Sequence, residues 1–290
     1  MRYWIGRGLV VAAAVVLAAS FAGDLHPLGD SLAVFRPVVL AGAALVALAV
    51  WRWTGARLLA VAAVAVALWH GAGILRTGPL PEGPADLVLY QKNMLYRPAD
   101  RGPLAEDIRA TGADLVTLQE VSPANRPMLD ALRDTFPHQL LCGESGVGGV
   151  AILSRTPLAD ERCSERFGVA RAVTRIDGQP LQVIALHLPW PWPMAQQELA
   201  QEYVADMAPL PDGPTVVGGD FNMVASGRSL AWIEAATGTT RVGPLVRTFS
   251  LKGYPLGIDH ILATGGTARL SVRPKLGSDH YGLAAEIRFP

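Results

Sequence analysis

The sequence predicts an α/β domain with two packed sheets and outer helices, preceded by an all-α transmembrane region. The first quarter of the chain is almost uninterrupted apolar sequence, whereas the remainder alternates short apolar runs with Gly and Pro punctuation. Apolar runs that are this short and are bounded by Gly, Pro or Asp favour strands over helices. A polar residue suited to metal binding or acid–base chemistry follows most of these runs. We therefore expect a site at the strand ends.

Three apolar stretches fill residues 1–76, over Trp4–Ala22, Val34–Trp51 and Leu58–Leu75. Each approaches the roughly 20 residues that a helix needs to cross a bilayer, and Trp residues near their ends suit the membrane interface. The second stretch is the weakest, because Arg36 must extend its charge to the interface. The alternative for the first stretch is a cleaved signal peptide, but two further apolar stretches follow it. We therefore predict three transmembrane helices in residues 1–76.

Basic residues indicate how these helices are oriented. Arg2 and Arg7 precede the first stretch, and Arg52 and Arg57 lie between the second and third, whereas the Gly23–Asp30 loop has no Lys or Arg. Because positive charge stays on the cytoplasmic side, the N-terminus and the 52–57 loop are predicted to be cytoplasmic. Three crossings then place the rest of the chain outside. The predicted localisation is a multi-pass protein of the cell membrane with an extracytoplasmic domain.

A Pro/Gly linker, residues 77–85, is predicted to separate the helices from a domain at residues 86–290. Residues 77–290 carry 19 basic and 23 acidic residues, because six of the 25 basic and two of the 25 acidic residues precede them. Nucleic-acid-binding domains usually carry a positive excess, so this balance counts against a general nuclease. The chain contains no internal repeat of the kind that solenoids and propellers show.

The elements of the predicted domain alternate along the chain. Two helices are expected, Leu104–Thr111, with Pro103 at its start and Gly112 at its end, and Ala195–Met207. The expected strands are Leu87–Tyr90, Leu115–Leu118, Gly149–Leu153, Leu181–Leu186 and Thr215–Val217.

The two cysteines, Cys142 and Cys163, both lie in the part predicted to be exported. In an oxidising compartment they can pair, and two isolated buried thiols are the equal alternative. Their surroundings lack the spacing of a zinc site.

The polar residues at the strand ends suggest metal-assisted hydrolysis of a phosphoester. They are Asn93, Glu120, His187, Asp220, Asn222, Asp259, Asp279 and His280. Such a reaction needs charge neutralisation on the phosphate, an activated water and help for the leaving oxygen. Carboxylate oxygens suit Mg²⁺, and Glu120 is the best candidate ligand. His280 is favoured as general base, because an imidazole titrates near pH ~6.5, although Asp220 is an alternative proton acceptor.

Asp220 and Asn222 are two residues apart, so they face the same side of an extended segment. There they can hold the attacking water and a phosphate oxygen. The structural alternative is an Asx turn after the Val216–Gly219 run.

The order of these motifs resembles the endonuclease/exonuclease/phosphatase superfamily. The resemblance covers residues 86–290 and rests on Gly-Asp-Phe-Asn (219–222), Ile-Asp-His-Ile-Leu (258–262) and Ser-Asp-His (278–280), supported by residues 149–155 and 247–249. It implies a four-layered α/β-sandwich and phosphoester hydrolysis with Mg²⁺ or Mn²⁺. The predicted three-span anchor is similar to a bacterial subgroup that includes membrane proteins linked to glycopeptide resistance.

The resemblance also implies individual roles. It places Asn93 beside the metal, with Asp279 joining Glu120 there. Asp259 is the carboxylate that orients His280, which fixes the tautomer of an imidazole, and His187 donates to the phosphate. His260 lies within a motif but is interpreted as a packing residue.

Two features depart from the abasic-site nucleases of this superfamily. Their mid-chain Tyr has no confident counterpart, and the nearest basic residue, Arg171, has a structural salt bridge as its equal alternative. The basic stretches that hold DNA in those enzymes are also missing.

Two Trp residues lie in the Pro-rich segment Leu188–Pro193. Trp190 and Trp192 can contact a membrane surface or a lipid chain near the site, or they can cap the domain's own core, and the segment leaves both interpretations open.

Three hypotheses follow. The first is a membrane-anchored phosphohydrolase that acts on a lipid-linked phosphate or pyrophosphate, whose effective concentration is high near the bilayer. The second is a metal-dependent nuclease acting on DNA, and the third is an inactive module that binds phosphate. The intact set of polar residues disfavours the third, and the pattern predicts no protein partner.

Overall fold

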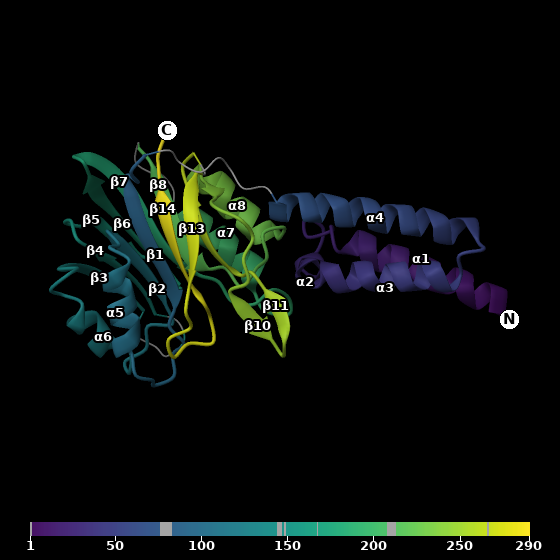
Figure 1. Ribbon diagram of the computed structural model, residues 1–290, viewed down its shortest axis with the longest axis horizontal. Helices are drawn as coiled ribbons and strands as arrows, with labels where there is room; N and C mark the ends of the chain where they lie inside the picture. The colour runs from purple at the N-terminus through teal and green to yellow at the C-terminus, as the bar shows by residue number, and fades with distance from the viewer. Residues whose placement is uncertain are drawn as a thin grey trace.

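The computed structural model describes residues 2–75, 83–143, 147, 149–166, 168–207, 213–265 and 267–290. Figure 1 shows a rod of helices, with the N-terminus at its far end, projecting from one side of a two-sheet sandwich. Most of the predicted 77–85 linker lies outside the described residues.

The rod is a bundle of apolar helices packed through small residues. It consists of α1 (Arg2–Ala19), α2 (Leu28–Val34), α3 (Arg36–Ala49) and α4 (Thr54–Leu75). Its core contains Ala43, Ala47, Ala56 and Ala63 together with Val10, Leu17, Leu40 and Leu59. Larger apolar side chains point outward, including Leu45, Leu58 and Leu68, each of which is 67% to 70% exposed. Alanine at the contacts lets the helices approach closely and leaves leucine and valine on the outside.

Within the described residues, no individual helix is long and apolar enough to qualify as a membrane span, whereas α2 and α3 qualify together although they are bent by 79°. The bend falls at Phe35, and Pro37 occupies the first turn of α3, where its missing N–H costs nothing. The three predicted spans therefore stay a prediction.

Arg36 differs from expectation. It is only 2% exposed and does not extend toward an interface. Its guanidinium donates to the carbonyl of Ser20, just beyond the end of α1, and lies 4.1 Å from the centre of the Phe21 ring. The last carbonyls of a helix lack donors of their own, and Arg36 supplies one.

The remaining chain forms two six-stranded sheets and a hairpin. The first sheet has the order β13-β14-β1-β2-β4-β3 and the second β5-β6-β7-β8-β12-β9, while β10 pairs with β11. Among the strand pairs of the described residues, β1–β2 and β7–β8 are parallel and the others are antiparallel. The strands are β1 (Leu87–Asn93), β2 (Leu115–Gln119), β3 (His138–Cys142), β4 (Val150–Ser154), β5 (Ala159–Cys163), β6 (Val169–Ile176), β7 (Gln179–His187), β8 (Thr215–Asp220), β9 (Thr240–Arg241), β10 (Phe249–Leu251), β11 (Tyr254–Leu256), β12 (Asp259–Ala263), β13 (Ala268–Arg273) and β14 (Gly282–Ile287).

Three apolar clusters hold four layers together. The cluster between the sheets includes Leu89, Ile152 and Val183. α5 (Gly102–Ala110) and α6 (Arg126–Ala131) cover the outer face of the first sheet. α7 (Gln196–Met207) and α8 (Arg228–Thr237) cover the outer face of the second. The predicted α/β sandwich with outer helices is thereby confirmed.

Two of these four outer helices were predicted, and α6 and α8 were not. α6 has only six residues and contains Pro127 in its first turn, so its periodicity is too short to recognise. α8 ends at Gly238 with φ +60°, a left-handed position that glycine adopts without strain. This glycine is the sequence signal that identifies the end of α8.

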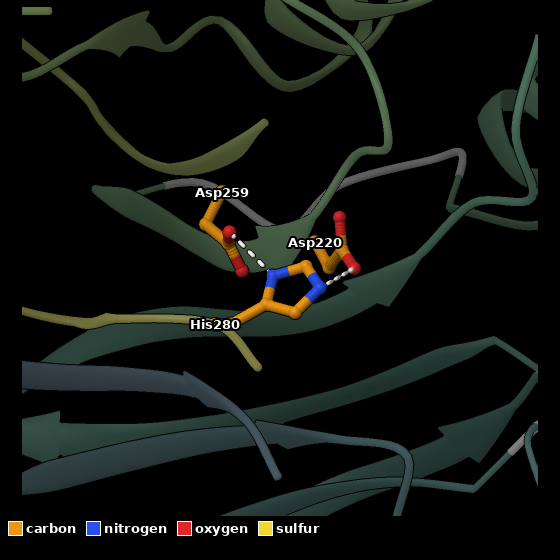
Figure 2. Close-up of side chains that lie close together, drawn as sticks. All are labelled: Asp220, Asp259 and His280. Carbon is orange, nitrogen blue, oxygen red and sulfur yellow. Dashed lines mark hydrogen bonds and ion pairs between the residues drawn. The ribbon is translucent and has the colours of Figure 1, made fainter. Parts of the chain in front are cut away.

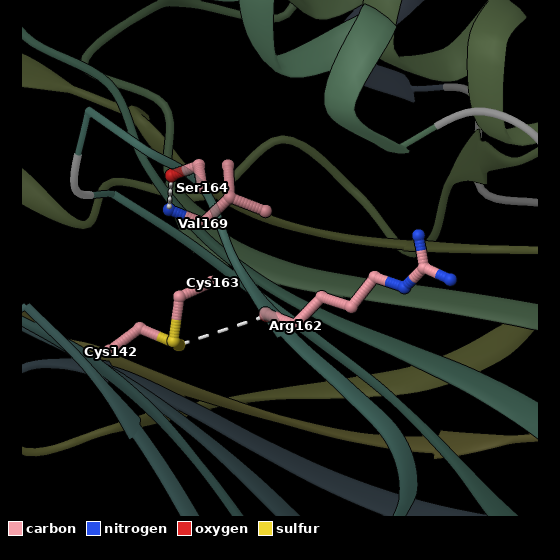
Figure 3. Close-up of a disulfide and its surroundings, with 5 residues drawn as sticks. All are labelled: Cys142, Arg162, Cys163, Ser164 and Val169. Atoms are coloured by element: carbon pink, nitrogen blue, oxygen red, sulfur yellow. Dashed lines mark hydrogen bonds between the residues drawn. A yellow bond between two sulfur atoms is a disulfide. The ribbon is translucent and has the colours of Figure 1, made fainter.

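Cys142 and Cys163 form a disulfide, with their Cα atoms 5.4 Å apart. The bond joins β3 to β5, which are edge strands of different sheets, and Figure 3 shows it between them. Of the two alternatives left open by the sequence, the paired state is the one observed.

The helical bundle contacts the sandwich through Asp30, which is 2% exposed. Its Oδ1 accepts a hydrogen bond from the backbone N–H of Arg228 at 2.9 Å, and its Oδ2 accepts one from Gln197 Nε2 at 2.8 Å. Arg228 is the first residue of α8, so Asp30 satisfies a donor at the start of that helix and places a negative charge at its positive end. The side chain of Val34 packs into the α7–α8 cluster.

Candidate active site

The ends of the parallel strands deliver the candidate residues from both sheets. Asn93 ends β1, and Glu120 directly follows β2. His187 and Asp220 end β7 and β8 at aligned positions, and Asp259 is aligned with Asp220 at the start of antiparallel β12. The two sheets thus carry their polar residues to one end of the sandwich, as the sequence predicted.

Glycine in β8 allows the two sheets to approach each other just before Asp220. A Cβ atom on Gly218 would lie 2.2 Å from Thr117 Oγ1 on β2, and one on Gly219 would lie 2.4 Å from the carbonyl oxygen of Leu186. Neither contact is possible for real atoms. Gly218 is therefore needed for the close approach of the two sheets beside Asp220, and Gly219 for the close packing of β8 against its neighbour β7.

Asn93 connects the two sheets. Its fully buried Nδ2 donates to Glu120 Oε1 at 3.0 Å and to Asp220 Oδ2 at 2.9 Å. Its Oδ1 accepts from the backbone N–H of Leu95 at 2.9 Å, which fixes the amide orientation. Two carboxylates are therefore held at a single amide nitrogen, in a region shielded from water.

Glu120 and Asn222 have left-handed backbone conformations, with φ of +56° and +46°. Such a conformation costs a non-glycine residue about 1–3 kcal/mol and is concentrated at functional sites. Glu120 is held by a hydrogen bond from the backbone N–H of Tyr96 to Oε2 at 2.8 Å. Asn222 donates its side-chain amide to the Leu188 carbonyl at 2.8 Å. The surrounding backbone thus supports both strained residues.

The Asx turn considered for Asp220 is present. Asp220 Oδ1 accepts from the backbone N–H of Asn222 at 2.8 Å, which leaves Oδ2 directed at Asn93. The turn and a chemical role coexist, because the two carboxylate oxygens have different partners.

His280 lies between two buried aspartates. Its Nδ1 is 2.8 Å from Asp259 Oδ2, and its Nε2 is 3.7 Å from Asp220 Oδ2. Figure 2 shows the imidazole between the two carboxylates, with one ring nitrogen directed at each. Asp259 Oδ1 accepts a further hydrogen bond from Gln91 Nε2 at 3.1 Å. This is the expected Asp–His pair, with the tautomer fixed by Asp259.

The charges in this group shift each other's pKa values. Burial raises the pKa of Asp220 to about 7, and the nearby charge of Asp259 adds to the increase. Burial also opposes ionisation of Asp259, but the charge and hydrogen bond of His280 outweigh it and lower the pKa of Asp259. Burial alone would lower the pKa of His280, yet the charges of Asp259 and Asp220 raise it to about 9.

His187 lies on the other side of Asp220, with Nε2 3.8 Å from Asp220 Oδ2. Burial lowers the pKa of His187, against the raising effect of the Glu120 charge. A neutral imidazole at this position is able to donate one N–H to a phosphate oxygen. Asp279, in contrast, is exposed, and its side chain forms no hydrogen bond or ion pair with the site residues in the described part of the chain.

His260 and Arg171 occupy structural positions. His260 Nε2 lies 2.8 Å from the Met223 carbonyl oxygen, and burial lowers its pKa to about 4. Arg171 is 5% exposed and donates to the carbonyl of Met207 at the end of α7. The salt bridge considered for Arg171 is not formed among the described residues, because β6 directs this side chain toward the end of α7.

The sequence analysis did not identify Lys92 as a site residue. Its Nζ donates to the backbone carbonyl of His280 at 2.6 Å and to that of Pro274 at 3.1 Å. Burial lowers the pKa of Lys92 to about 7. A lysine near the end of a buried strand was the available signal, because such a residue is rarely buried without a specific partner.

A second unrecognised feature is the aromatic contact with His280. The Phe249 ring lies 4.7 Å from the imidazole, and Trp190 lies 5.9 Å from Phe249. Trp190 also packs against the α7–α8 cluster. Trp192 is instead 47% exposed and lies 6.4 Å from His26 of the helical bundle. The two Trp residues therefore differ, with Trp190 covering the core and Trp192 at the junction with the bundle.

Comparison with known proteins agrees with this arrangement. Residues 90–280 match the Endonuclease/Exonuclease/phosphatase family. The chain belongs to this family. Its members are hydrolases that act on phosphoester bonds. No curated protein matches the chain in the sequence search.

Solved structures similar to this family member share its fold. Beta toxin from Staphylococcus aureus, solved with bound magnesium ions, has a TM-score of 0.55 at 16% identity and covers 70% of this chain and 100% of its own. An AP endonuclease from Archaeoglobus fulgidus has a TM-score of 0.56 at 19% identity, over 69% of this chain and 98% of its own. D. rerio TDP2, complexed with a single-strand DNA product, has a TM-score of 0.56 at 15% identity, over 69% and 97%.

The donor set of this family member fits a hard divalent cation. Glu120 and Asp220 present carboxylate oxygens on either side of Asn93, and such ligands suit Mg²⁺ and Mn²⁺. Asp220, Asp259 and His280 also place ligand atoms within 4.8 Å of one another. However, Asp259 and His280 are already hydrogen-bonded to each other. The Glu120–Asn93–Asp220 group is therefore the better match to a cation.

Proposed function

We propose that the protein is a membrane-anchored phosphohydrolase, dependent on Mg²⁺ or Mn²⁺, that cleaves a lipid-linked phosphate or pyrophosphate outside the cytoplasm. The observation that carries the hydrolase part is the position of His280, with Asp259 on one ring nitrogen and Asp220 near the other. This pair lies next to the carboxylates that meet at Asn93. The family supplies the phosphoester chemistry, and the substrate class is inferred from the helices.

In this proposal His280 is the general base. Asp259 keeps the proton on Nδ1. Because the pKa of His280 is raised to about 9, it is the neutral form of the ring, favoured as pH rises toward that value, that presents a free Nε2 and accepts the proton of the attacking water. The resulting hydroxide attacks phosphorus, and the bond from phosphorus to the leaving oxygen breaks. Asp220, whose pKa is raised to about 7, is the alternative proton acceptor.

The other side chains position the phosphate and balance its charge. His187 donates an N–H to a phosphate oxygen. Asn222, whose amide donates to the Leu188 carbonyl in the structure, is the other group predicted from the sequence to hold a phosphate oxygen. Glu120 and Asp220 would hold the divalent cation through their carboxylate oxygens, beside Asn93, with Asp279 as the additional ligand predicted from the sequence. The cation neutralises charge on the phosphate oxygens when it is bound.

Apolar exposure on the helices supports a membrane location. Side chains such as Trp4, Leu9, Val15, Leu45 and Val61 are at least half exposed, and contiguous apolar surface of this kind marks membrane or protein contact sites. The bundle joins the sandwich beside Trp192, which suits an aromatic residue at a membrane interface. This location favours a substrate that is itself held in the membrane.

The test is hydrolysis by full-length protein in lipid vesicles with Mg²⁺. A polyprenyl pyrophosphate and supercoiled plasmid DNA are offered separately, with His280→Ala and the matched control His138→Ala, a histidine on the edge strand β3. Phosphate release from the lipid, lost only in His280→Ala, supports the proposal. Plasmid nicking with no lipid hydrolysis would replace it with the nuclease hypothesis, and inactivity on both substrates would favour a phosphate-binding module.

A further inference from the structure

An apolar cavity of about 490 Å³ lies where the helical bundle meets the sandwich. Its bundle side includes Val34 on α2, Pro37 on α3 and Trp69 on α4. Its sandwich side includes Tyr254 and Leu256 of β11. Val34 and Leu256 are almost fully buried, whereas Trp69 is 59% exposed. The cavity therefore extends from the domain core to the outer apolar surface of the bundle.

The sandwich walls of this cavity lead directly to the candidate active site. Leu256 and Gly257 line it and precede Asp259 by only a few residues. Val246 and Arg247 also line it and lead into Thr248, whose hydroxyl accepts the backbone N–H of Asp259 at 3.1 Å. The next residue, Phe249, contacts His280. The Val246–Phe249 segment therefore begins at the cavity and ends beside the His280 imidazole.

Arg247 gives the cavity a cationic rim on the side of the active site. The residue is exposed, and its guanidinium carbon lies 5.9 Å from the ring of Tyr281, the residue after His280. Lys275 Nζ lies 5.2 Å from the same ring. Cations within about 6 Å of an aromatic ring are held there by its charge distribution. Arg247 therefore connects the cavity wall to the residue next to His280, and Lys275 lies against the same ring.

We propose that this cavity binds the apolar chain of a membrane lipid whose phosphate head is held by Arg247 beside His280. The inference rests on the proposed function and adds the place where its substrate is recognised. An apolar volume continuous with exposed apolar helices suits a lipid chain, and the charge of Arg247 in its wall is complementary to an anionic head. The apolar chain of the lipid then lies at the Val246 end of the Val246–Phe249 segment, and its phosphate lies toward the Phe249 end, beside His280.

The binding test uses full-length protein in nanodiscs and phosphatidic acid with a diazirine at the end of its acyl chain. Ala72, on the cavity wall, is changed to Phe to fill the space. The matched control is Ala65→Phe, at an exposed position two turns earlier on α4. We expect labelled peptides from residues 245–257, and several-fold less label there in Ala72→Phe but not in Ala65→Phe. Equal labelling in both variants, or label confined to the outer faces of the helices, overturns the proposal.

The hydrolysis test compares a long-chain phosphodiester with bis(p-nitrophenyl) phosphate, which is soluble in water. Ala72→Phe should lower kcat/KM about tenfold on the long-chain substrate only, the equivalent of two methylene groups displaced from an apolar site. Arg247→Gln should raise KM for both substrates, with Lys252→Gln, an exposed cation on the β10–β11 turn, as its control. If Ala72→Phe leaves the long-chain reaction unchanged, the chain does not bind in the cavity.

The two proposals fail in different ways. Labelling of the cavity without hydrolysis of either substrate supports the lipid-binding inference and overturns the proposed function. Hydrolysis of the lipid without labelling of residues 245–257 supports the proposed function and overturns the binding site.

Discussion

Nδ1 of His280 and Oδ2 of Asp259 lie 2.8 Å apart, with both side chains almost fully buried. Because Asp259 starts β12 and His280 precedes β14, this pair connects strands of the two different sheets. The contact that prepares the imidazole for chemistry therefore also contributes to holding the sheets together.

The first prediction concerns the pH dependence of stability. The pKa of His280 is raised in the folded protein to about 9 from an ordinary 6.5. Its stabilising contribution is complete below about pH 6.5 and is lost as pH rises through about 9. The pKa of Asp259 is lowered, so its contribution is present above its ordinary pKa and is lost in acid. Chemical denaturation of the wild type across this range should show both losses.

Asp259→Asn is the matching variant. It removes the largest charge that raises the pKa of His280, so the imidazole should titrate at least one unit lower in a ¹³C-histidine NMR titration. The alkaline loss of stability should then move to lower pH. An unchanged titration would contradict the assigned pair, and His138, far along the chain on β3, provides an internal reference.

The second prediction is that Asp220→Asn abolishes hydrolysis while leaving the fold as stable as before or more stable. Burial and the Asp259 charge raise the pKa of Asp220, which means that the folded state disfavours its ionised form at neutral pH. Removing that charge should increase the free energy of unfolding by about 1 kcal/mol. Denaturation and activity are measured on the same preparation, and a large loss of stability would show that Asp220 has a structural role.

The third prediction concerns divalent cations. Glu120→Gln should weaken Mn²⁺ binding by at least about tenfold, because a carboxylate oxygen in the proposed ligand group is lost. Electron paramagnetic resonance of free Mn²⁺ measures the affinity. Glu106→Gln, on the exposed side of α5, is the control and should bind as the wild type does. Equal affinities in the two variants would remove Glu120 from the ligand group.

The fourth prediction is that the cation lowers the pKa of His280. The charge of Asp220 is one of the causes that raise this pKa, and a cation bound to that carboxylate offsets the charge. Histidine NMR titrations of His280 with and without Mg²⁺ should therefore differ. Binding without any shift would place the cation away from Asp220.

The fifth prediction concerns the disulfide, which closes a loop of 21 residues. The double variant Cys142→Ser, Cys163→Ser should lose roughly 3 kcal/mol of stability, because the unfolded chain regains the freedom of that loop. Denaturation of the variant and of the reduced wild type should give similar values. Activity at low temperature should persist, since neither β3 nor β5 carries a residue of the His280–Asp259 pair.

The strand ends were the part of the structure that the sequence predicted best. Asn93, Glu120 and Asp220 follow short apolar runs, and the parallel pairing of two strands in each sheet carries them together. Periodicity and punctuation are local properties, so they identify where a strand ends. They contain no information on which strands become neighbours, and the motif order supplied that part.

Long-range contacts were the part that could not be predicted. Lys92 was not recognised because its partners are backbone carbonyls about 180 residues away. Arg36 is buried because it donates to the Ser20 carbonyl just beyond α1, a contact that forms only when the helices pack together. Asp30 stabilises the first turn of α8 across 198 residues. In each case the sequence shows a polar residue in an unusual place, but it does not show which distant residue that side chain contacts.

The Cys142–Cys163 bond ties together two strands that each have an unpaired edge. Such edges can add strands from other molecules and begin aggregation. β5 already carries the charged residues Asp160, Glu161 and Arg162 in an exposed strand, and the bond prevents β3 and β5 from separating to offer a flat edge. A chain made under reducing conditions would therefore be expected to self-associate before it loses catalytic activity. Solubility would then report a missing disulfide more sensitively than activity does.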